Sequence, residues 1–218
     1  ARMSLALGVD EWGELEHRIE KLLELAMGPP PKGIFGKLGA LGDIIKMGRI
    51  GPKEVGSGPC QEVVETENPS LSEIPIVKCW PDDGGRYITL PLVFTHDPST
   101  ARRNVGMYRL QVFDERTLGM HWQLHKGGSE HFRQAKNENQ RIEVAIAVGT
   151  DPVLTYAATA PLPPDVDEMV FAGFLRGKSV EMVRCKTVDI LVPAHSEFII
   201  EGYVDPAESR TEGPFGDH

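Results

Sequence analysis

Glycine and proline divide this chain into two parts with different periodicities. Residues 28–31 read Gly-Pro-Pro-Pro, and residues 48–59 are again rich in both residue types. Proline lacks a backbone N–H and clashes with the preceding turn, so neither stretch continues a helix or a central strand. We therefore expect a helical N-terminal segment with its linker over residues 1–55, followed by a compact domain over residues 56–218.

The N-terminal part has the period of a helix. Across residues 11–27 apolar positions recur three and four residues apart, with acidic and basic residues between them. This spacing predicts an amphipathic helix. Its apolar stripe consists of Trp12, Leu15, Ile19, Leu22 and Ala26. A second, shorter helix is predicted over residues 37–47, although Gly39 and Gly42 weaken the pattern.

From Cys60 onward the pattern changes to that of strands, and in segments such as 87–94, 118–124 and 142–148 residues of one face recur in steps of two. Helices are predicted over residues 165–176 and 127–136, the latter with Ser129 as its N-cap. Many short strands with few helices indicate a mainly β fold (α+β) with helical insertions, either a barrel or a sandwich. The predicted strands cover residues 87–94, where Pro91 requires an edge or a bulge, 106–113 and 118–124 as a hairpin with 114–117 as its turn, 142–148, 186–192 and 196–204.

Composition excludes several classes of function. The 218 residues include 23 basic and 32 acidic side chains, giving a net charge of −9 that argues against nucleic-acid binding. No apolar run is long enough to span a bilayer, and GxGxxG and GxxxxGK[ST] phosphate-binding motifs are absent. The three cysteines are widely spaced without a CxxC motif, so we expect reduced, buried thiols and a cytoplasmic location.

The segment Asn104-Val-Gly-Met-Tyr-Arg109 places an amide and a guanidinium at the start of a predicted strand. Because a lone buried charge is costly, Arg109 needs an anionic partner. Two carboxylates beside one arginine can be driven to different pKa values, which is the electrostatic basis of a general acid/base pair. The competing interpretation is a solvated acidic loop. The candidate acids near the C-terminus are Glu201, Asp205, Glu208, Glu212 and Asp217.

Two other groups of residues are candidate sites. Asn104, His131 and Glu168 each stand beside or within a predicted turn, and their amide, imidazole and carboxylate suit Mn²⁺ or Mg²⁺ better than zinc. Small residues before a proline run in Thr155–Pro164 allow a backbone to approach a flat ligand, or form a tight loop between strand and helix. The imidazoles that compete with His131 are His121, His125 and His195.

Several blocks of this sequence, in the same order along the chain, resemble the UbiD-type decarboxylases. Such an ordered set is far more specific than any single motif. The blocks are Asn104-x-Gly-x-Tyr-Arg109, His125-Lys-Gly-Gly128, Pro161-Leu-Pro163, Glu168-x-x-Phe-Ala-Gly-Phe-Leu-Arg-Gly177, Val192-Pro-Ala-x-Ser-Glu197, Glu201-Gly-Tyr203 and Glu212-Gly-Pro-Phe-Gly-Asp-His218, and Gly58-Pro-Cys-Gln61 and Cys79-Trp-Pro81 fit as well.

The resemblance implies a split β-barrel like that of flavin reductases and a prenylated FMN cofactor. It also implies a divalent metal, typically Mn²⁺ (or Mg²⁺), held by Asn104, His131 and Glu168, often with K⁺ nearby. Among these ligands His131 is the one whose spacing varies within the family. The residues that would contact the cofactor are Asn104, Val105, Gly106, Met107, Tyr108, Arg109, Glu130, His131, Ala158, Thr159, Ala160, Pro161 and Glu168.

The activity implied is the reversible, non-oxidative decarboxylation of an aromatic or α,β-unsaturated acid. A 3-polyprenyl-4-hydroxybenzoate-type acid, as in ubiquinone biosynthesis, is the default substrate. The implied catalytic residues are Arg109, Glu212 and Asp217. Arg109 would orient the substrate carboxylate and hold Glu212, and Asp217 would protonate the carbon that CO₂ leaves.

Members of the family are longer, so we expect this chain to be part of a longer protein whose C-terminal domain builds a homo-oligomer. A flavin prenyltransferase is the expected cofactor supplier. The competing interpretation is a non-catalytic flavin- or metal-binding split-barrel module, which would bind flavin without releasing CO₂. An ordinary flavin reductase fits less well, because hydride transfer needs no carboxylate pair such as Glu212 and Asp217.

Overall fold

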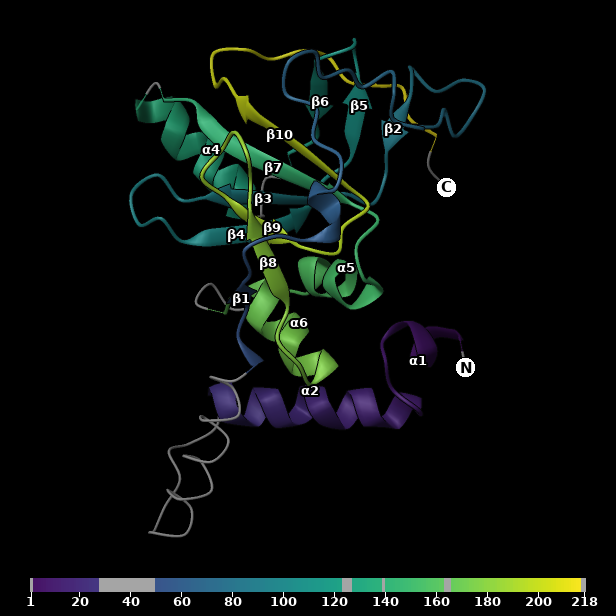
Figure 1. Ribbon diagram of the computed structural model, residues 1–218, viewed down its shortest axis with the longest axis vertical. Coiled ribbons are helices and arrows are strands. Elements are labelled where there is room, and N and C mark those ends of the chain that lie inside the picture. Colours follow the sequence, from purple (N-terminus) through teal and green to yellow (C-terminus); the bar gives the residue numbers. More distant parts are fainter. Residues whose placement is uncertain (1, 28–49, 123–126, 139, 163–165, 217–218) are drawn as a thin grey trace, which may run out of the picture. The chain divides into compact units, whose positions relative to one another are not determined.

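The computed structural model describes residues 2–27, 50–122, 127–138, 140–162 and 166–216, and the chain divides into two compact units. Unit 1 comprises Ala1–Val55 and Asp151–Met182, and unit 2 comprises Gly56–Thr150 and Val183–His218. Residues 151–182, which we expected in the second domain, therefore group with the N-terminal residues. The fold is mixed α/β, with strands concentrated in unit 2 (Figure 1).

Unit 1 is mainly helical. It contains α1 (Arg2–Ala6), α2 (Trp12–Met27), α5 (Pro152–Thr159) and α6 (Glu168–Arg176), together with β1 (Lys53–Glu54). The two-residue strand β1 pairs in parallel with the start of β8 (Glu181–Arg184). The side chain of Asp167 caps α6 by accepting hydrogen bonds from the N–H groups of Met169 (2.7 Å) and Val170 (3.1 Å), and Gly177 ends the helix with a φ of 72°.

The predicted amphipathic helix is confirmed as α2. Leu15 is buried as predicted, whereas Trp12 is 55% exposed and does not belong to the core. The predicted helix over residues 37–47 lies outside the described residues. No helix in the described part of the chain is long and apolar enough to cross a membrane.

The loop predicted over residues 155–164 is wrong in its first half, which is the helix α5. Asp151 caps this helix with a side-chain hydrogen bond from the Val153 N–H (2.9 Å), and Pro152 occupies its first position. Both features favour a helix start, and Ala157 and Ala158 are good helix formers. Of the four predicted cofactor residues in this stretch, Ala158 and Thr159 lie in the last turn of α5, and Ala160 and Pro161 follow it as irregular chain.

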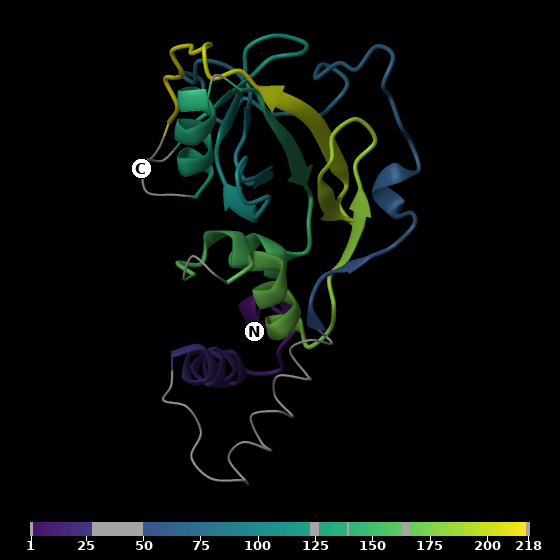
Figure 2. The same ribbon diagram turned by 90° about the vertical axis from the view of Figure 1, so that its left-hand side faces the viewer.

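Unit 2 is built around a four-stranded antiparallel sheet in the order β10–β7–β3–β4 (Figures 1 and 2). The helix α4 (Gly127–Glu138) packs against this sheet through Ala135, which lies in a buried cluster with Ile142 and Val144. It begins two residues before Ser129, so Ser129 lies in its first turn and is not the N-cap. The strands are β3 (Leu92–His96), β4 (Arg103–Met107), β7 (Ile142–Val148) and β10 (Phe198–Val204).

A second sheet in unit 2 has the order β2–β5–β6. Its strands are β2 (Tyr87–Ile88), β5 (Leu110–Val112) and β6 (Leu118–Met120), and β5 and β6 form the predicted hairpin. One buried cluster joins the two sheets, and its members are Ile88, Val93, Tyr108, Leu110 and Ile146. Burial of such side chains stabilises the fold by about 1.5–3 kcal/mol each.

Two predicted strands are each divided between these sheets. Residues 87–94 separate into β2 and β3, with the break at Pro91, which cannot donate to a sheet. Residues 106–113 separate into β4 and β5 around Tyr108 and Arg109. The Tyr108 ring lies against Gly106, and its hydroxyl accepts a hydrogen bond from the Gly128 N–H (3.1 Å). Arg109 is therefore in a link between sheets rather than within one long strand.

The strand predicted over residues 186–192 is also wrong over most of its length. The strand β9 covers Leu191–Pro193 only, and β8 precedes it. Glu201 on β10 accepts hydrogen bonds from the backbone N–H groups of Lys186 (2.9 Å) and Thr187 (2.6 Å), which holds this stretch as a turn. Within the described residues the strands form three sheets and no closed barrel, so the flavin-reductase-like split barrel is not confirmed.

The cysteines differ in exposure. Cys185 is buried as predicted, Cys60 is half-buried, and Cys79 is exposed, which corrects the expectation that all three are buried. All three are free thiols. Burial raises the pKa of the Cys60 and Cys185 thiols, so neither is a reactive thiolate at neutral pH.

Candidate functional site

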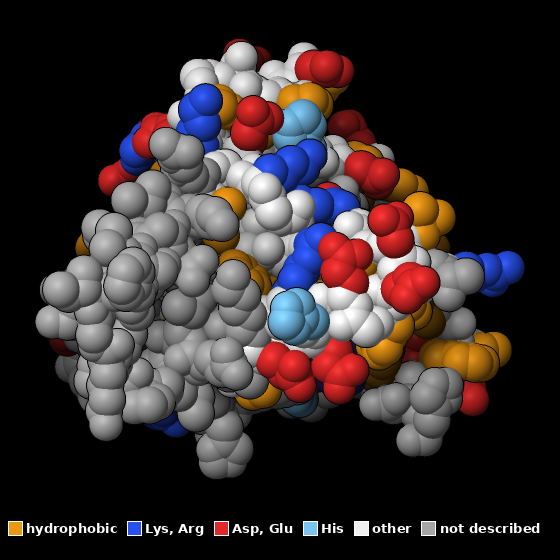
Figure 3. Space-filling view, turned by 90° about the horizontal axis from the view of Figure 1, so that it is seen from below, with side chains coloured by type: hydrophobic (Ala, Val, Ile, Leu, Met, Phe, Trp, Pro, Cys, Tyr) orange, Lys and Arg blue, Asp and Glu red, His pale blue; other side chains and the backbone are white. Residues whose placement is uncertain are grey.

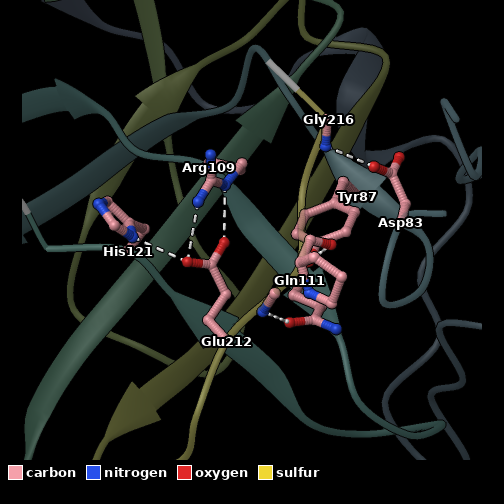
Figure 4. A network of polar contacts seen from close by, with 9 residues as sticks. Asp83, Tyr87, Arg109, Gln111, His121, Glu212 and Gly216 are labelled. Atoms are coloured by element: carbon pink, nitrogen blue, oxygen red, sulfur yellow. Dashed lines mark hydrogen bonds and ion pairs between the residues drawn. The ribbon is translucent and has the colours of Figure 1, made fainter.

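The predicted pairing of Arg109 with a C-terminal acid is present in unit 2, and the acid is Glu212 (Figure 4). Arg109 Nε donates to Glu212 Oε1 (2.6 Å), and Nη2 donates to Oε2 (2.9 Å). Two parallel charge-assisted hydrogen bonds fix the carboxylate in the plane of the guanidinium. The side chains are 27% and 15% exposed, so the pair is shielded but reachable from solvent.

The charge state of Glu212 follows from these contacts. The hydrogen bonds from Arg109 hold the pKa of this carboxyl below its usual range, against the opposing effect of partial burial. A further contact with His121 acts in the same direction as Arg109. Glu212 is therefore an anion at neutral pH, and in this arrangement it is not a proton donor.

His121 lies directly after β6 and contacts the same carboxylate. Its backbone N–H donates to the Arg109 carbonyl (3.0 Å), which continues the β5–β6 pairing by one residue pair. Its Nδ1 lies 2.8 Å from Glu212 Oε2. Sequence reasoning considered His121 only as a competing metal ligand. The hairpin register is the signal that would have placed it opposite Arg109.

Two aromatic rings that contact each other lie against the guanidinium of Arg109. The Cζ of Arg109 lies 4.4 Å from the Phe215 ring centroid and 5.8 Å from that of Tyr87. The rings contact each other edge to face, with centroids 4.7 Å apart. Such cation–π contacts attract the guanidinium and restrict its orientation. Arg109 is thus fixed by rings as well as by Glu212.

Residues 212–216, here called the C-terminal strap, are hydrogen-bonded to the small sheet and to the loop before it. The Gly213 N–H donates to Gln111 Oε1 (2.8 Å). The Pro214 carbonyl accepts from the Gly84 N–H (2.6 Å) and the Tyr87 hydroxyl (3.1 Å). These contacts join positions more than 100 residues apart in sequence and explain how Glu212 reaches Arg109.

Asp83 holds the far end of the strap. This carboxylate is 4% exposed and accepts hydrogen bonds from the N–H groups of Gly216 (2.6 Å) and Trp80 (2.9 Å) (Figure 4). Burial alone would raise the pKa of Asp83, but the backbone N–H donors outweigh it and leave the pKa lowered. Asp83 is therefore a buried, ionised anchor for the residue that precedes Asp217.

We expect Asp83→Asn to loosen the C-terminal strap, because an amide replaces one of the two acceptor oxygens by a donor. Amide hydrogen exchange at Gly216 should accelerate by about 10- to 100-fold, as for the loss of one hydrogen bond to a charged group. The matched control is Asp82→Asn, since Asp82 is an exposed neighbour. Equal exchange at Gly216 in the two variants would contradict the anchoring role.

The remaining C-terminal acids have different positions. Glu201 holds the turn at Lys186 and Thr187, and Asp205 forms an ion pair with Arg141 Nε (3.1 Å). Glu208 is exposed, and Asp217 lies outside the described residues. Of the acids considered, the structure therefore brings Glu212 to Arg109, and the role of Asp217 stays a prediction.

Asn104 shows a feature that suits a bound phosphate or metal. It lies on β4 opposite Thr95 of β3. Its Nδ2 is buried and has no hydrogen-bond partner in the described part of the chain. A buried amide left unpaired is costly. The amide fits a ligand that accepts a hydrogen bond from it, or a cation that binds its oxygen after the amide turns over.

His131 fits the predicted metal site less well. It is 3% exposed on α4, with Nδ1 2.9 Å from the Thr95 hydroxyl and Nε2 3.9 Å from Asp97 Oδ2. The pKa of Asp97 is lowered by several hydrogen bonds, of which the one from the Ser99 side chain has the largest effect. An ionised carboxylate therefore faces the ring of His131. Thr95 engages Nδ1, so a metal held by His131 would have to bind at Nε2, on the side of the ring that faces Asp97.

The other predicted cofactor residues belong to both units. In unit 2, Val105 and Gly106 are buried in β4 and Tyr108 is buried beyond its end. In unit 1, Glu168 begins α6. The Glu130 side chain lies outside the described part. Among the described residues, no three His, Cys, Asp or Glu side chains gather as a metal-binding group, so the metal ligands stay a prediction.

One face of the molecule shows how its charged side chains are distributed (Figure 3). On the face shown in Figure 3, basic side chains form a short central row that is flanked by acidic ones, with no extended basic patch among the described residues. Binding of nucleic acid usually depends on such a basic surface.

Comparison with known proteins finds similar sequences over the whole chain. The family model described as UbiD, 3-octaprenyl-4-hydroxybenzoate carboxy-lyase Rift-related domain, matches residues 53–218. An uncharacterized protein of Archaeoglobus fulgidus is 50% identical over 218 residues, which cover all of this chain and 44% of that protein. One of Aquifex aeolicus is 46% identical with the same coverage. The chain thus spans 44% of the length of these curated relatives.

Several solved structures have the same fold as this chain. The UbiD-class enzyme HmfF from Pelotomaculum thermopropionicum, in complex with FMN, superposes with a TM-score of 0.80 at 30% identity, covering 99% of this chain and 43% of that one. An evolved dimeric form of HmfF in complex with prFMN gives 0.79 at 30% identity over 99% and 45%. Vanillic acid decarboxylase of Sedimentibacter hydroxybenzoicus gives 0.79 at 28% identity over 99% and 43%.

Proposed function

Because this chain belongs to the UbiD carboxy-lyase family, we propose that the complete protein catalyses reversible, non-oxidative decarboxylation of an aromatic or α,β-unsaturated acid. The single observation that carries the proposal is the clamp between Arg109 and Glu212, which unites two separate blocks of the family pattern. A solvated acidic loop would not place a shielded carboxylate in two short hydrogen bonds to one guanidinium.

Prenylated FMN is the proposed cofactor, and when bound it supplies the electron sink that loss of CO₂ requires. Two of the similar structures contain FMN or prFMN, which supports this choice. In unit 2 the buried, unpaired amide of Asn104 fits the phosphate end of such a group or its metal. Mn²⁺ or Mg²⁺ would be held by Asn104, His131 and Glu168, with K⁺ nearby.

Arg109 would bind the substrate carboxylate, since its guanidinium is partly exposed and held against two aromatic rings. Glu212 would keep that guanidinium oriented and remain ionised. A carboxyl group at Asp217 would then deliver its proton to the substrate carbon after CO₂ departs. The two acids would thus differ in role. Glu212 accepts from two nitrogens of Arg109 and stays ionised, whereas the proton donor must be able to hold a proton.

The finer aspects of the proposal rest on the family. The matched model names 3-octaprenyl-4-hydroxybenzoate carboxy-lyase, so a 3-polyprenyl-4-hydroxybenzoate-type acid is the first substrate to assay, followed by vanillic acid. We further propose a homo-oligomer and a flavin prenyltransferase that supplies the cofactor. We also propose that the strands of unit 2 belong to a split barrel.

The test is CO₂ release from a panel of acids by the complete, cofactor-loaded protein and by its Asp217→Asn variant. We expect Asp217→Asn to lose about 10²- to 10⁴-fold in turnover, as for removal of a general acid, with flavin absorbance unchanged. Asp205→Asn is the control, since Asp205 pairs with Arg141 instead. Intact turnover in Asp217→Asn would refute the assigned proton donor. Flavin binding without CO₂ release from any acid would favour the non-catalytic module.

A further inference from the structure

The open end of the β5–β6 hairpin presents two nitrogen-bearing side chains to one carboxylate. Leu110 of β5 pairs with Met120 of β6. The next residue pair is Arg109 and His121, which are joined by a backbone hydrogen bond. Figure 4 shows the Glu212 carboxylate between these two side chains. The arrangement is set by the hairpin register, so it is part of the fold rather than a chance meeting of surface groups.

The hydrogen-bond directions identify the proton on the imidazole. An ionised carboxylate can only accept, and Arg109 already donates to both oxygens of Glu212. The contact of 2.8 Å between His121 Nδ1 and Glu212 Oε2 therefore requires a hydrogen on Nδ1. Glu212 Oε2 then accepts from Arg109 and from His121, which approach from opposite strands of the hairpin.

We propose that His121 is a positioning residue that holds Glu212 through its Nδ1–H while Arg109 engages the substrate carboxylate. The proposal rests on the proposed function for the role of Arg109. A substrate carboxylate would share the guanidinium with Glu212 and draw it partly away from that acid. Without a second donor, Glu212 would be left as a shielded, unpaired anion. His121 provides that donor and keeps Glu212 from following the substrate or turning away.

Three substitutions at His121 separate this role from simple packing. His121→Ala removes the donor, and we expect kcat to fall by about 10- to 100-fold, the cost of one hydrogen bond to a charged group. His121→Asn should recover most of the loss, because its side-chain Nδ2 occupies the place of Nδ1. His121→Gln should not, since its amide extends one bond further. His17→Ala, at an exposed histidine on α2, is the control and should be unchanged.

A second measurement needs no cofactor. In the unloaded protein, His121→Ala, Glu212→Gln and the double variant form a double-mutant cycle, read as urea unfolding midpoints. Contact between the residues predicts non-additive effects. This cycle remains informative if the complete protein releases no CO₂, so failure of the proposed function is distinguishable from failure of the contact. Additive effects would refute the contact, and an unchanged kcat in His121→Ala, or a loss in His121→Asn equal to that in His121→Ala, would refute the positioning role.

Discussion

Arg109→Lys is expected to lower the turnover of the complete, cofactor-loaded protein by at least about 100-fold. Lysine preserves the charge but offers a point-like ammonium instead of a planar fork with parallel donors. It cannot reproduce the two hydrogen bonds of 2.6 and 2.9 Å to the oxygens of Glu212. Nor can it lie flat against Phe215, whose ring centroid is 4.4 Å from the guanidinium carbon. The substrate carboxylate would then meet a cation without fixed orientation.

The measurement is kcat and KM of the variant against those of Arg141→Lys. Arg141 is a matched control because it also lies over an aromatic ring, that of Tyr203 at 4.4 Å, and also pairs with a carboxylate, that of Asp205. Its side chain is 60% exposed, and an exposed pair contributes little. We expect Arg141→Lys to behave as the unchanged protein. If Arg109→Lys kept its turnover, charge alone would suffice, and the bidentate geometry would have no catalytic role.

Long segments with a regular pattern of apolar residues were predictable from sequence. The structure confirms β7 with the predicted bounds, and it confirms α2 and β10 with starts that lie one and two residues later than predicted. Breaks were harder to predict. Pro91 signalled an interruption, but whether the chain bends within one sheet or crosses to another depends on tertiary packing, here on the core shared by Val93 and Tyr108. The turn at Lys186 was hidden because a distant side chain, Glu201, supplies its acceptors.

The same limit applies to the site. Spacing alone identified Arg109 as a cation in need of a partner and offered five acids. Choosing Glu212 among them depended on the family resemblance, since the other acids differ from it only in their tertiary partners. His121 was out of reach for a similar reason. The predicted hairpin could place His121 opposite Arg109, but its contact with Glu212 also depends on the path of the C-terminal strap, which is not written in local sequence.

Gly84→Ala is expected to have a second large effect on stability and turnover, because Gly84 lies against the C-terminal strap. A Cβ at Gly84 would overlap the carbonyl oxygen of Gly213 and lie 2.6 Å from its carbonyl carbon. Both partners are backbone and cannot turn aside. The Gly84 N–H also donates to the Pro214 carbonyl (2.6 Å), so moving the strap away breaks that bond. We expect a loss of about 1–3 kcal/mol in the free energy of unfolding, as for other overpacked sites.

The catalytic consequence should be larger than the loss of stability suggests. A shift of the strap by about 1 Å moves Glu212 away from Arg109, and misplacement on that scale costs on the order of 100-fold in rate. Gly85→Ala is the control, because a Cβ there would lie 3.5 Å from its nearest neighbours, an ordinary contact. The measurements are urea unfolding and kcat of both variants, and they test whether the close approach at Gly84 positions Glu212. If Gly84→Ala matched Gly85→Ala in both measurements, the strap would have another way to hold Glu212, and the close approach at Gly84 would not be what positions the carboxylate.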